Sequence, residues 1–265
     1  MNPLPRPVLA VTACFLEEVD RLLPGRMTGL FLHGSICWGE FFPGSDIDFV
    51  GLWDDLPGGD ALDQLRAAHK ATGVRFPTPA FDGFHCTADD LAEDPSVVTH
   101  RPVFYEGEFD AAGTTDINPV TWHELAERPV VVRGQMPPVH TDLPRLSAFT
   151  RDKLDTYWRG CIGQIEQAGI AAVGEHDDAI AWLVLGAARL HHLLARGSIT
   201  SKSGAGRHVV ESLDPRWHQI AREALRIREA PGDPSLYADT GARGRDMHDL
   251  LVWLVDDGTT RADDE

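Results

Sequence analysis

Two pairs of residues between positions 34 and 48 have types and spacing that could do chemistry on phosphates. Gly34 and Ser35 are followed, after ten intervening residues, by Asp46 and Asp48. The two acids are separated by one apolar residue, so on a β-strand both carboxylates point to the same face. Carboxylate oxygens on a rigid surface are the ligands that Mg2+ prefers. The pattern predicts nucleotidyl transfer from a metal-bound nucleoside triphosphate.

The small residues Gly34 and Ser35 are expected to form a phosphate-binding turn. Phe31 and Leu32, just before them, are typical of the end of a strand. Glycine permits close approach of the backbone, and serine can cap the short helical segment that follows. Free backbone N–H groups at the start of a helix bind phosphate. We therefore expect Gly34 and Ser35 to contact the triphosphate.

A third acid, Asp82, is the best candidate for a general base. Transfer of a nucleotide to a hydroxyl requires a proton acceptor within hydrogen-bond reach. Asp82 lies between Phe81 and Phe84, which are typical strand residues, and an acid within an apolar strand needs a reason. The alternative is a hairpin turn, because Asp82 and Gly83 form the Asp-Gly pair that favours tight turns. The residues alone leave both interpretations open.

Composition and charge restrict the class of protein. The chain has 265 residues, 43% hydrophobic and 25% charged, which suits a globular protein with two modest domains. Its net charge of -17 disfavours a nucleic-acid partner and favours a small cationic substrate, although acidity can also serve solubility alone. We find no membrane span, no signal peptide and no paired cysteines, so we expect a cytoplasmic protein with reduced thiols.

The periodicity of apolar residues divides the chain into two parts. The first part alternates between strands and helices, which predicts layers of helices on a sheet. Residues 134–146 contain three prolines and are interpreted as a linker. We expect an α+β protein with a mixed sheet and helices in residues 1–146 and an all-α helical domain in residues 147–265. The elements predicted in the first part are strands at 29–33, 47–53, 81–86 and 130–133 and helices at 8–23 and 58–72.

The second part has almost no strand signals. Asp177 and Asp178 can cap a helix that Gly197 ends after Arg196. His191 and His192 lie within this helix, where adjacent side chains point in different directions, so a paired metal site is not expected there. The predicted helices are 147–168, 177–196, 206–213, 216–229 and 244–256.

The spacing of glycines and acids resembles that of the nucleotidyltransferase superfamily built on the DNA polymerase beta palm. Within that superfamily, the chain is most similar to the aminoglycoside adenylyltransferases that modify streptomycin and spectinomycin. Their GSxxxGxxxPxSDIDxxV pattern is matched residue by residue as far as Asp48, and the apolar stretch that follows, residues 50–52, comes one position later than in the family. The matching residues are Gly34, Ser35, Gly39, Pro43, Ser45, Asp46, Ile47 and Asp48.

The helical part resembles the family more weakly, through AARLHHLLARGSITSK. The resemblance implies that Arg189 and Lys202 contact ATP phosphates, as do Gly34, Ser35 and Ser45. Alternatively, Arg189 is a surface arginine whose stem covers apolar neighbours, and Lys202 is a loop lysine. The run SKSGAGRH is not a P-loop, because the GK[ST] order and a preceding strand are missing.

The same resemblance implies a substrate cleft between the domains. Asp177 and Asp178 would bind amines of the acceptor, although acids at a helix start also serve as simple caps. The family's FGEW stretch corresponds here to Glu106, Gly107, Glu108 and Phe109, so Phe109 replaces the aromatic placed against streptomycin. The family's third acid is commonly glutamate, whereas Asp82 is one methylene shorter.

Taken together, the resemblance implies a monomeric, Mg2+-dependent enzyme that uses ATP. It would move AMP to a hydroxyl of a small cationic acceptor, an aminoglycoside or aminocyclitol, with Asp46 and Asp48 as metal ligands and Asp82 as base. Two alternatives remain. One is an interaction protein of the toxin-antitoxin or protein-modifying kind. The other is a nucleotide-binding relative that has lost turnover.

Overall fold

The computed structural model describes residues 3–261 and divides the chain into two compact units, with the division between Thr141 and Asp142. The three prolines of residues 134–146 predict a linker there, but helix α5 (Leu143–Lys153) already begins within this segment. The Asp142 side chain accepts a hydrogen bond from the Arg145 N–H, and a proline lies in the first turn, so this part of the segment is a helix start. That part of the linker prediction was wrong.

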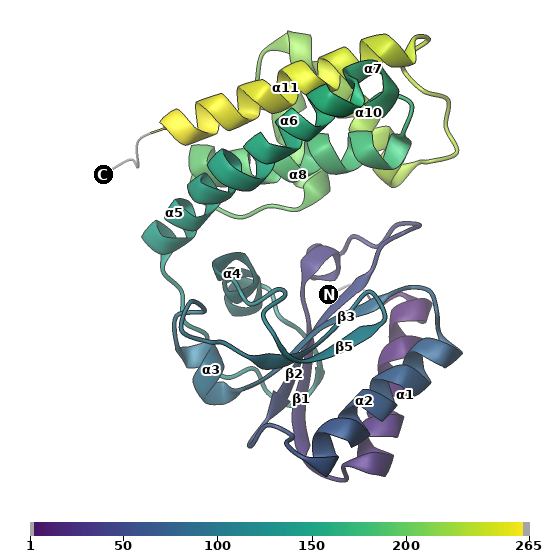
Figure 1. The fold of residues 1–265 in the computed structure, drawn as a ribbon, viewed down its shortest axis with the longest axis vertical. Coiled ribbons are helices and arrows are strands. Elements are labelled where there is room, and N and C mark those ends of the chain that lie inside the picture. The colour runs from purple at the N-terminus through teal and green to yellow at the C-terminus, as the bar shows by residue number, and fades with distance from the viewer. Residues whose placement is uncertain (1–2, 262–265) are drawn as a thin grey trace. The chain divides into compact units, whose positions relative to one another are not determined.

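A six-stranded mixed sheet forms the centre of the first unit (Figure 1). Its order is β5-β4-β3-β2-β1-β6. Strands β2 and β3 pair in parallel, and the other neighbouring pairs are antiparallel. The predicted α+β class with a mixed sheet is confirmed. The strands are β1 (Met27–Leu32), β2 (Ile47–Trp53), β3 (Phe81–Thr87), β4 (Arg101–Tyr105), β5 (Glu108–Gly113) and β6 (Val130–Arg133).

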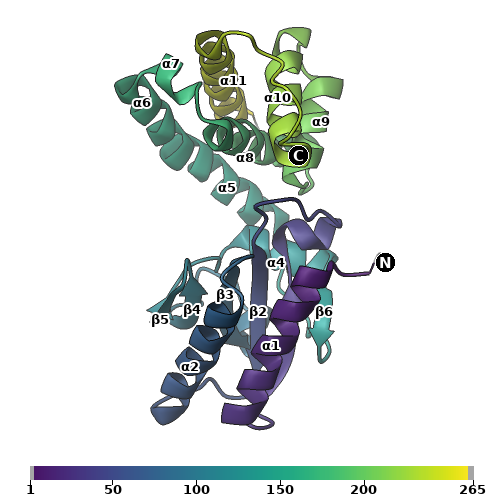
Figure 2. The same cartoon turned by 90° about the vertical axis from the view of Figure 1, so that its right-hand side faces the viewer.

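Helices cover both faces of this sheet. Helices α1 (Arg6–Leu22) and α2 (Asp60–Arg75) lie side by side against one face (Figure 2). On that face Phe15 of α1 packs on Phe49 of β2, with ring centroids 5.8 Å apart. The opposite face carries α3 (Ala88–Ala92) and α4 (Pro119–Glu127), and there Phe84 stacks on Trp122 at 5.7 Å. The side chains of β1, β2, β3 and β4 therefore alternate between two apolar cores.

Strands β4 and β5 were not predicted from the sequence. Most residues of β5 are exposed, and this strand lies at the edge of the sheet, so it lacks the apolar pattern of a buried strand. The two strands are joined by Glu106 and Gly107, both with positive φ, as in the hairpin turns that match strand twist. The hairpin at Asp82 and Gly83, considered as an alternative, is wrong because both residues lie inside β3.

The second unit contains only helices and turns within residues 142–261. Helix α8 (Asp177–Arg196) has its predicted bounds and ends at Gly197 in the left-handed conformation. It supplies much of the core, with Ile180, Val184 and Leu185 fully buried. The remaining helices are α6 (Arg159–Ala168), α7 (Ile170–Val173), α9 (Lys202–Ser212), α10 (His218–Glu229) and α11 (Thr240–Thr260), with a π-helical turn at Leu154–Trp158 before α6. Across residues 3–261, none of the helices combines the length and the apolar character needed to cross a membrane.

Candidate active site

The parallel pairing of β2 with β3 brings the three predicted acids together. Asp48 and Asp82 are direct partners in the register, and the Ile47 N–H donates to the Ala80 carbonyl at 2.8 Å. Side chains alternate along each strand, so Asp48 and Asp82 project from the face opposite α1 and α2. The charge of Asp46, two residues before Asp48, acts on both carboxyls.

Gly83 is what allows these strands to lie so close. A Cβ at this position would stand 2.0 Å from the Phe49 carbonyl oxygen, so any larger residue would displace β3 from β2. The same glycine follows Asp82 directly, so it fixes where that acid lies beside Asp48. The residue that suggested a turn in the sequence therefore serves close strand packing.

Burial and mutual repulsion shape the electrostatics of the acids. Burial raises the pKa of Asp48 to about 7; the charge of His33 opposes this, and the charges of Asp46 and Asp116 add to it. Burial also raises the pKa of Asp82 to about 6, against a hydrogen bond from the Glu106 N–H at 3.1 Å. Among residues 3–261, no lysine or arginine pairs with these acids. The cluster is therefore short of positive charge and suited to a cation.

The turn after β1 lies directly against Asp48. Gly34 has φ +62°, and a Cβ there would lie 1.8 Å from Asp48 Oδ2, so only glycine fits. Ser35 Oγ is buried without a hydrogen-bond partner. However, the Gly34 N–H donates to Glu124 Oε2 at 3.0 Å. The expectation of free N–H groups was therefore wrong for Gly34, and Ser35 Oγ is the unpartnered group at this turn.

Glu124 was missed by the sequence analysis, as was the helix that carries it. Helix α4 has a recognisable start, since Asn118 caps it and Pro119 is its first residue. Glu124 lies between buried neighbours in this short helix and is itself only 4% exposed. The one local sign of a special role for Glu124 is that this acid lies close to the apolar residues Trp122 and Leu125 in the sequence. Its contact with Gly34 spans 90 positions of the chain, which no local pattern reveals.

The carboxylates of Asp46 and Asp48 are candidate ligands for Mg2+. Within residues 3–261, no group of three or more histidine, cysteine or acidic side chains is arranged to hold a metal by itself. Mg2+ is commonly bound by one or two carboxylates together with substrate phosphates, with no closed protein site. Asp46 and Asp48 offer hard oxygen ligands on one face, and Asp48 lies against Gly34 of the Gly34–Ser35 turn. The residues present fit a Mg2+ ion that is bound together with a triphosphate.

Ser45 lies just before the acids and closes a turn. Its hydroxyl accepts the Phe42 N–H at 3.0 Å, and its own N–H donates to the Phe42 carbonyl at 2.9 Å. These bonds fix the direction in which the chain enters Asp46 and β2. The observed contacts of Ser45 are therefore with the turn that orients the first acid.

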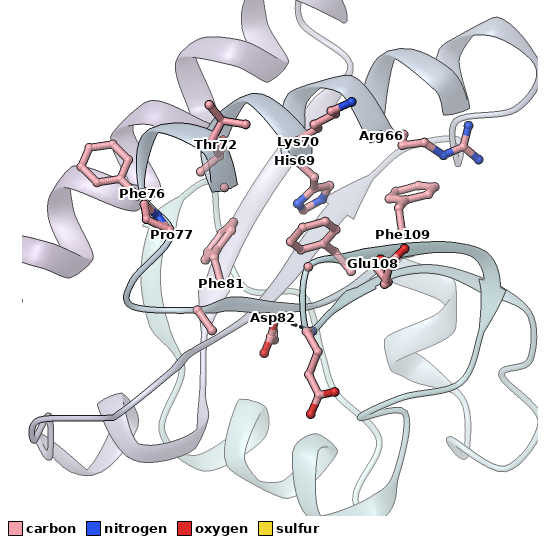
Figure 3. Close-up of a pocket in the computed structure, with 16 residues that line it drawn as sticks. Arg66, His69, Lys70, Thr72, Phe76, Pro77, Phe81, Asp82, Glu108 and Phe109 are labelled. Atoms are coloured by element: carbon pink, nitrogen blue, oxygen red, sulfur yellow. Dashed lines mark hydrogen bonds between the residues drawn. The ribbon is translucent and has the colours of Figure 1, made fainter.

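Phe109 lies away from the three acids. Its ring packs on the α2 side of the sheet, with the Arg66 guanidinium 5.1 Å from the ring centroid. It lines a cavity of about 700 Å3 beside α2, whose lining also reaches Asp82. Figure 3 shows the Phe109 ring facing α2, whereas the Asp82 carboxylate points away from the aromatic rings. The structure does not bring Phe109 to the face that carries Asp46 and Asp48.

The predicted residues of the second unit have different surroundings. Asp177 forms ion pairs with Arg243 at 2.6 Å and Arg226 at 3.3 Å, whereas Asp178 is exposed. Neither acid is the cap of α8, because His176 holds that position.

Arg189 and Lys202 both lie in helices of the second unit. Arg189 is half-buried within α8, which is compatible with phosphate binding and with a surface arginine whose stem covers apolar neighbours. Lys202 is the first residue of α9, after the capping Ser201, so the alternative of a loop lysine was wrong.

Comparisons with known proteins support the fold. No protein-family model matches the chain, and no curated protein is similar to it in sequence. Among solved structures, the chain is similar to spectinomycin adenyltransferase AAD(9) from Enterococcus faecialis, a crystal structure with ATP and spectinomycin. The TM-score is 0.63 at 12% sequence identity, covering 92% of this chain and 99% of the other. The mixed sheet, the helical unit and this likeness together show that the chain shares the fold of this adenyltransferase.

Proposed function

We propose that the protein is a Mg2+-dependent nucleotidyltransferase that moves AMP from ATP to a hydroxyl of a small cationic acceptor. The observation that carries this proposal is the cluster of Asp46, Asp48 and Asp82 on one sheet face, without a lysine or arginine partner in the described chain. Its fold neighbour was solved with ATP and spectinomycin, which supports ATP as the donor.

Each acid has a proposed role that follows from its surroundings. Asp46 and Asp48 would hold Mg2+, which when bound stabilises charge on the attacking and leaving oxygens. Asp82 uses one oxygen to accept the Glu106 N–H, which leaves the other to accept the proton of the acceptor hydroxyl. A pKa of about 6 places Asp82 near the range in which a base works well at neutral pH.

Several residues are proposed as nucleotide contacts. Ser35 Oγ is a buried donor without a partner and would bond a phosphate oxygen. Arg189 and Lys202 remain proposed phosphate-binding residues, and Ser45 acts by orienting the turn before Asp46. If Arg189 binds phosphate, Arg189→Ala raises the KM for ATP more than it lowers kcat.

The proposed acceptor is an aminoglycoside or aminocyclitol. A net charge of -17 attracts cations, and Glu106 places an exposed carboxylate next to Asp82. Of the two helix-start acids, Asp178 is exposed, whereas Asp177 is already engaged by arginines. Asp178 is thus the better proposed amine ligand of the pair.

The proposal is tested by release of pyrophosphate from ATP and Mg2+ with streptomycin, spectinomycin or kanamycin added separately. We expect at least one acceptor to stimulate release by the wild type, and none to do so with Asp48→Asn. The matched control is Asp55→Asn, an exposed acid just after β2. Tight ATP binding without release for any acceptor would instead favour a relative that has lost turnover.

A further inference from the structure

Glu124 reaches the proposed phosphate-binding turn from a distant part of the chain. The turn is the 3-10 segment η1 (Gly34–Trp38). Glu124 Oε2 accepts the Gly34 N–H at 3.0 Å, and Oε1 lies 3.5 Å from the Trp38 Nε1 donor. One buried carboxylate thus contacts both the first and the last residue of η1.

A second residue at the end of α4 holds the same segment. The Arg128 guanidinium lies 4.2 Å from the centroid of the Trp38 ring, within the range of a cation–π contact. Arg128 is the C-cap of α4, one turn beyond Glu124. Helix α4 therefore contacts both ends of η1. Glu124 accepts a hydrogen bond from Gly34 at the first residue, and Arg128 lies over the ring of Trp38 at the last.

The position of this turn sets the space beside the metal-binding acid. Gly34 already lies so close to Asp48 that there is no room for a Cβ. The His33 N–H donates to the Asp48 carbonyl at 3.1 Å, and His33 Nδ1 lies 3.5 Å from Glu124 Oε2. Release of Gly34 from Glu124 would allow the turn to move relative to Asp48.

We propose that Glu124 is a positioning residue that fixes the Gly34–Ser35 turn for nucleotide binding. Glu124 does not need to touch the nucleotide, because it acts through the Gly34 N–H. The inference rests on the proposed function only in that the turn binds phosphate. A hydrogen bond to a buried carboxylate is among the stronger kinds, so its loss has a measurable effect on the turn.

The test measures the turn and nucleotide binding separately. Hydrogen exchange reports the protection of the Gly34 amide, and calorimetry reports the Kd for Mg-ATP. For Glu124→Ala we expect both exchange and Kd to rise by about 10-fold to 100-fold, the range for loss of a charged hydrogen bond. Glu124→Gln retains an accepting oxygen and should stay within about 3-fold of the wild type on both measures, as an uncharged acceptor is weaker.

Two further variants distinguish positioning from general stability. Glu124→Asp keeps the negative charge, but its side chain is one methylene shorter and its carboxylate cannot reach the Gly34 N–H. Its Gly34 exchange and its Kd for Mg-ATP should therefore resemble those of Glu124→Ala. Glu127→Ala removes an exposed acid from the same helix and should leave both measurements unchanged. Glu124→Asp also keeps the test usable if Glu124→Ala does not fold.

Unchanged Gly34 exchange in Glu124→Asp and Glu124→Ala would overturn the inference. It would also be overturned if exchange rose while the Kd for Mg-ATP stayed at the wild-type value. A wild type that does not bind Mg-ATP would overturn the proposed function instead, and the exchange data would still decide whether Glu124 holds the turn.

Discussion

Buried acids in the two units have opposite surroundings. In the sheet unit, burial and neighbouring carboxylates raise the pKa of Asp48 to about 7. In the helical unit, Glu223 is fully buried, whereas Asp48 is half-buried, and Arg226 and Arg243 donate to Glu223 at 3.0 Å. Burial alone would raise the pKa of Glu223, yet these bonds and those from Ser235 and Leu236 outweigh it and lower the pKa to about 2.

This difference separates a structural acid from a candidate ligand. Arg226 and Arg243 supply the countercharge of Glu223, and removal of that acid would leave both buried arginines with only the more exposed Asp177 as an ion-pair partner. Asp48 has no lysine or arginine partner among the described residues, and the charge of His33 offsets the effect of burial only in part, so a bound cation would complete the compensation. Perturbed carboxyls of the second kind are typical of functional sites.

The largest expected effect is on activity in the sheet unit. Asp48→Asn should lower AMP transfer by about 10²-fold to 10³-fold or more, the scale for loss of a key electrostatic group. Its melting temperature should stay equal or rise, because the substitution removes a buried, repelled charge. A large loss of stability would show that Asp48 is structural, like Glu223.

In the helical unit, substitution of the buried acid Glu223 should lower the free energy of unfolding. Glu223→Gln should cost about 3–5 kcal/mol, the range for removal of one partner from a buried ion pair. Urea unfolding measures this loss. Glu229→Gln, in the same helix but in the more exposed pair with Arg207, should cost no more than about 1 kcal/mol. Equal losses of unfolding free energy in the two variants would show that the buried ion pairs of Glu223 stabilise the unit no more than an exposed pair does.

Acid should weaken the helical unit through the same residue. Since the pKa of Glu223 is lowered to about 2, its stabilisation is present above the unfolded pKa of about 4.5 and is lost as the pH falls toward 2. The loss is about 3 kcal/mol over that window. Asp48 has the opposite sign, since a raised pKa favours the folded state at low pH. The urea midpoints of the wild type and Glu223→Gln should therefore converge as the pH falls from 4.5 to 2. A difference between the two midpoints that stays constant over this range would contradict a lowered pKa for Glu223.

The smallest effect is expected at Asp177. Its side chain is 47% exposed, so water screens its ion pairs with Arg243 and Arg226. Asp177→Asn should cost less than about 1 kcal/mol in urea unfolding. A loss of unfolding free energy as large as that of Glu223→Gln would show that Asp177 contributes as much as Glu223 to the ion pairs with Arg226 and Arg243.

The sequence predicted the central strands and the acids they carry. Strand β2 was located from its apolar run, and the spacing of Asp46 and Asp48 placed both on one face. The hairpin of β4 and β5 was missed because an exposed edge strand needs few apolar residues. Helix α4 was missed because it is short and its role depends on a contact with Gly34 far away in the chain.

The distinction between the two kinds of acid could not be predicted at all. Asp177 and Asp48 are the same residue type, and only folding brings Arg243 to Asp177 across 66 positions. Asp177, predicted from the sequence to bind substrate, therefore already has ion-pair partners in the structure. Local spacing shows which face an acid occupies, but tertiary structure decides whether its charge is compensated.

We propose that Mg2+ and ATP bind at the acids of the sheet unit, Asp46, Asp48 and Asp82. The most direct measurement is the rise in melting temperature on addition of Mg-ATP to wild type, Asp48→Asn and the control Asp55→Asn. Ligand at about 100 times its Kd stabilises the folded state by about 2.7 kcal/mol. We predict an upward shift for the wild type and Asp55→Asn and none for Asp48→Asn. An equal shift in all three proteins would contradict the account.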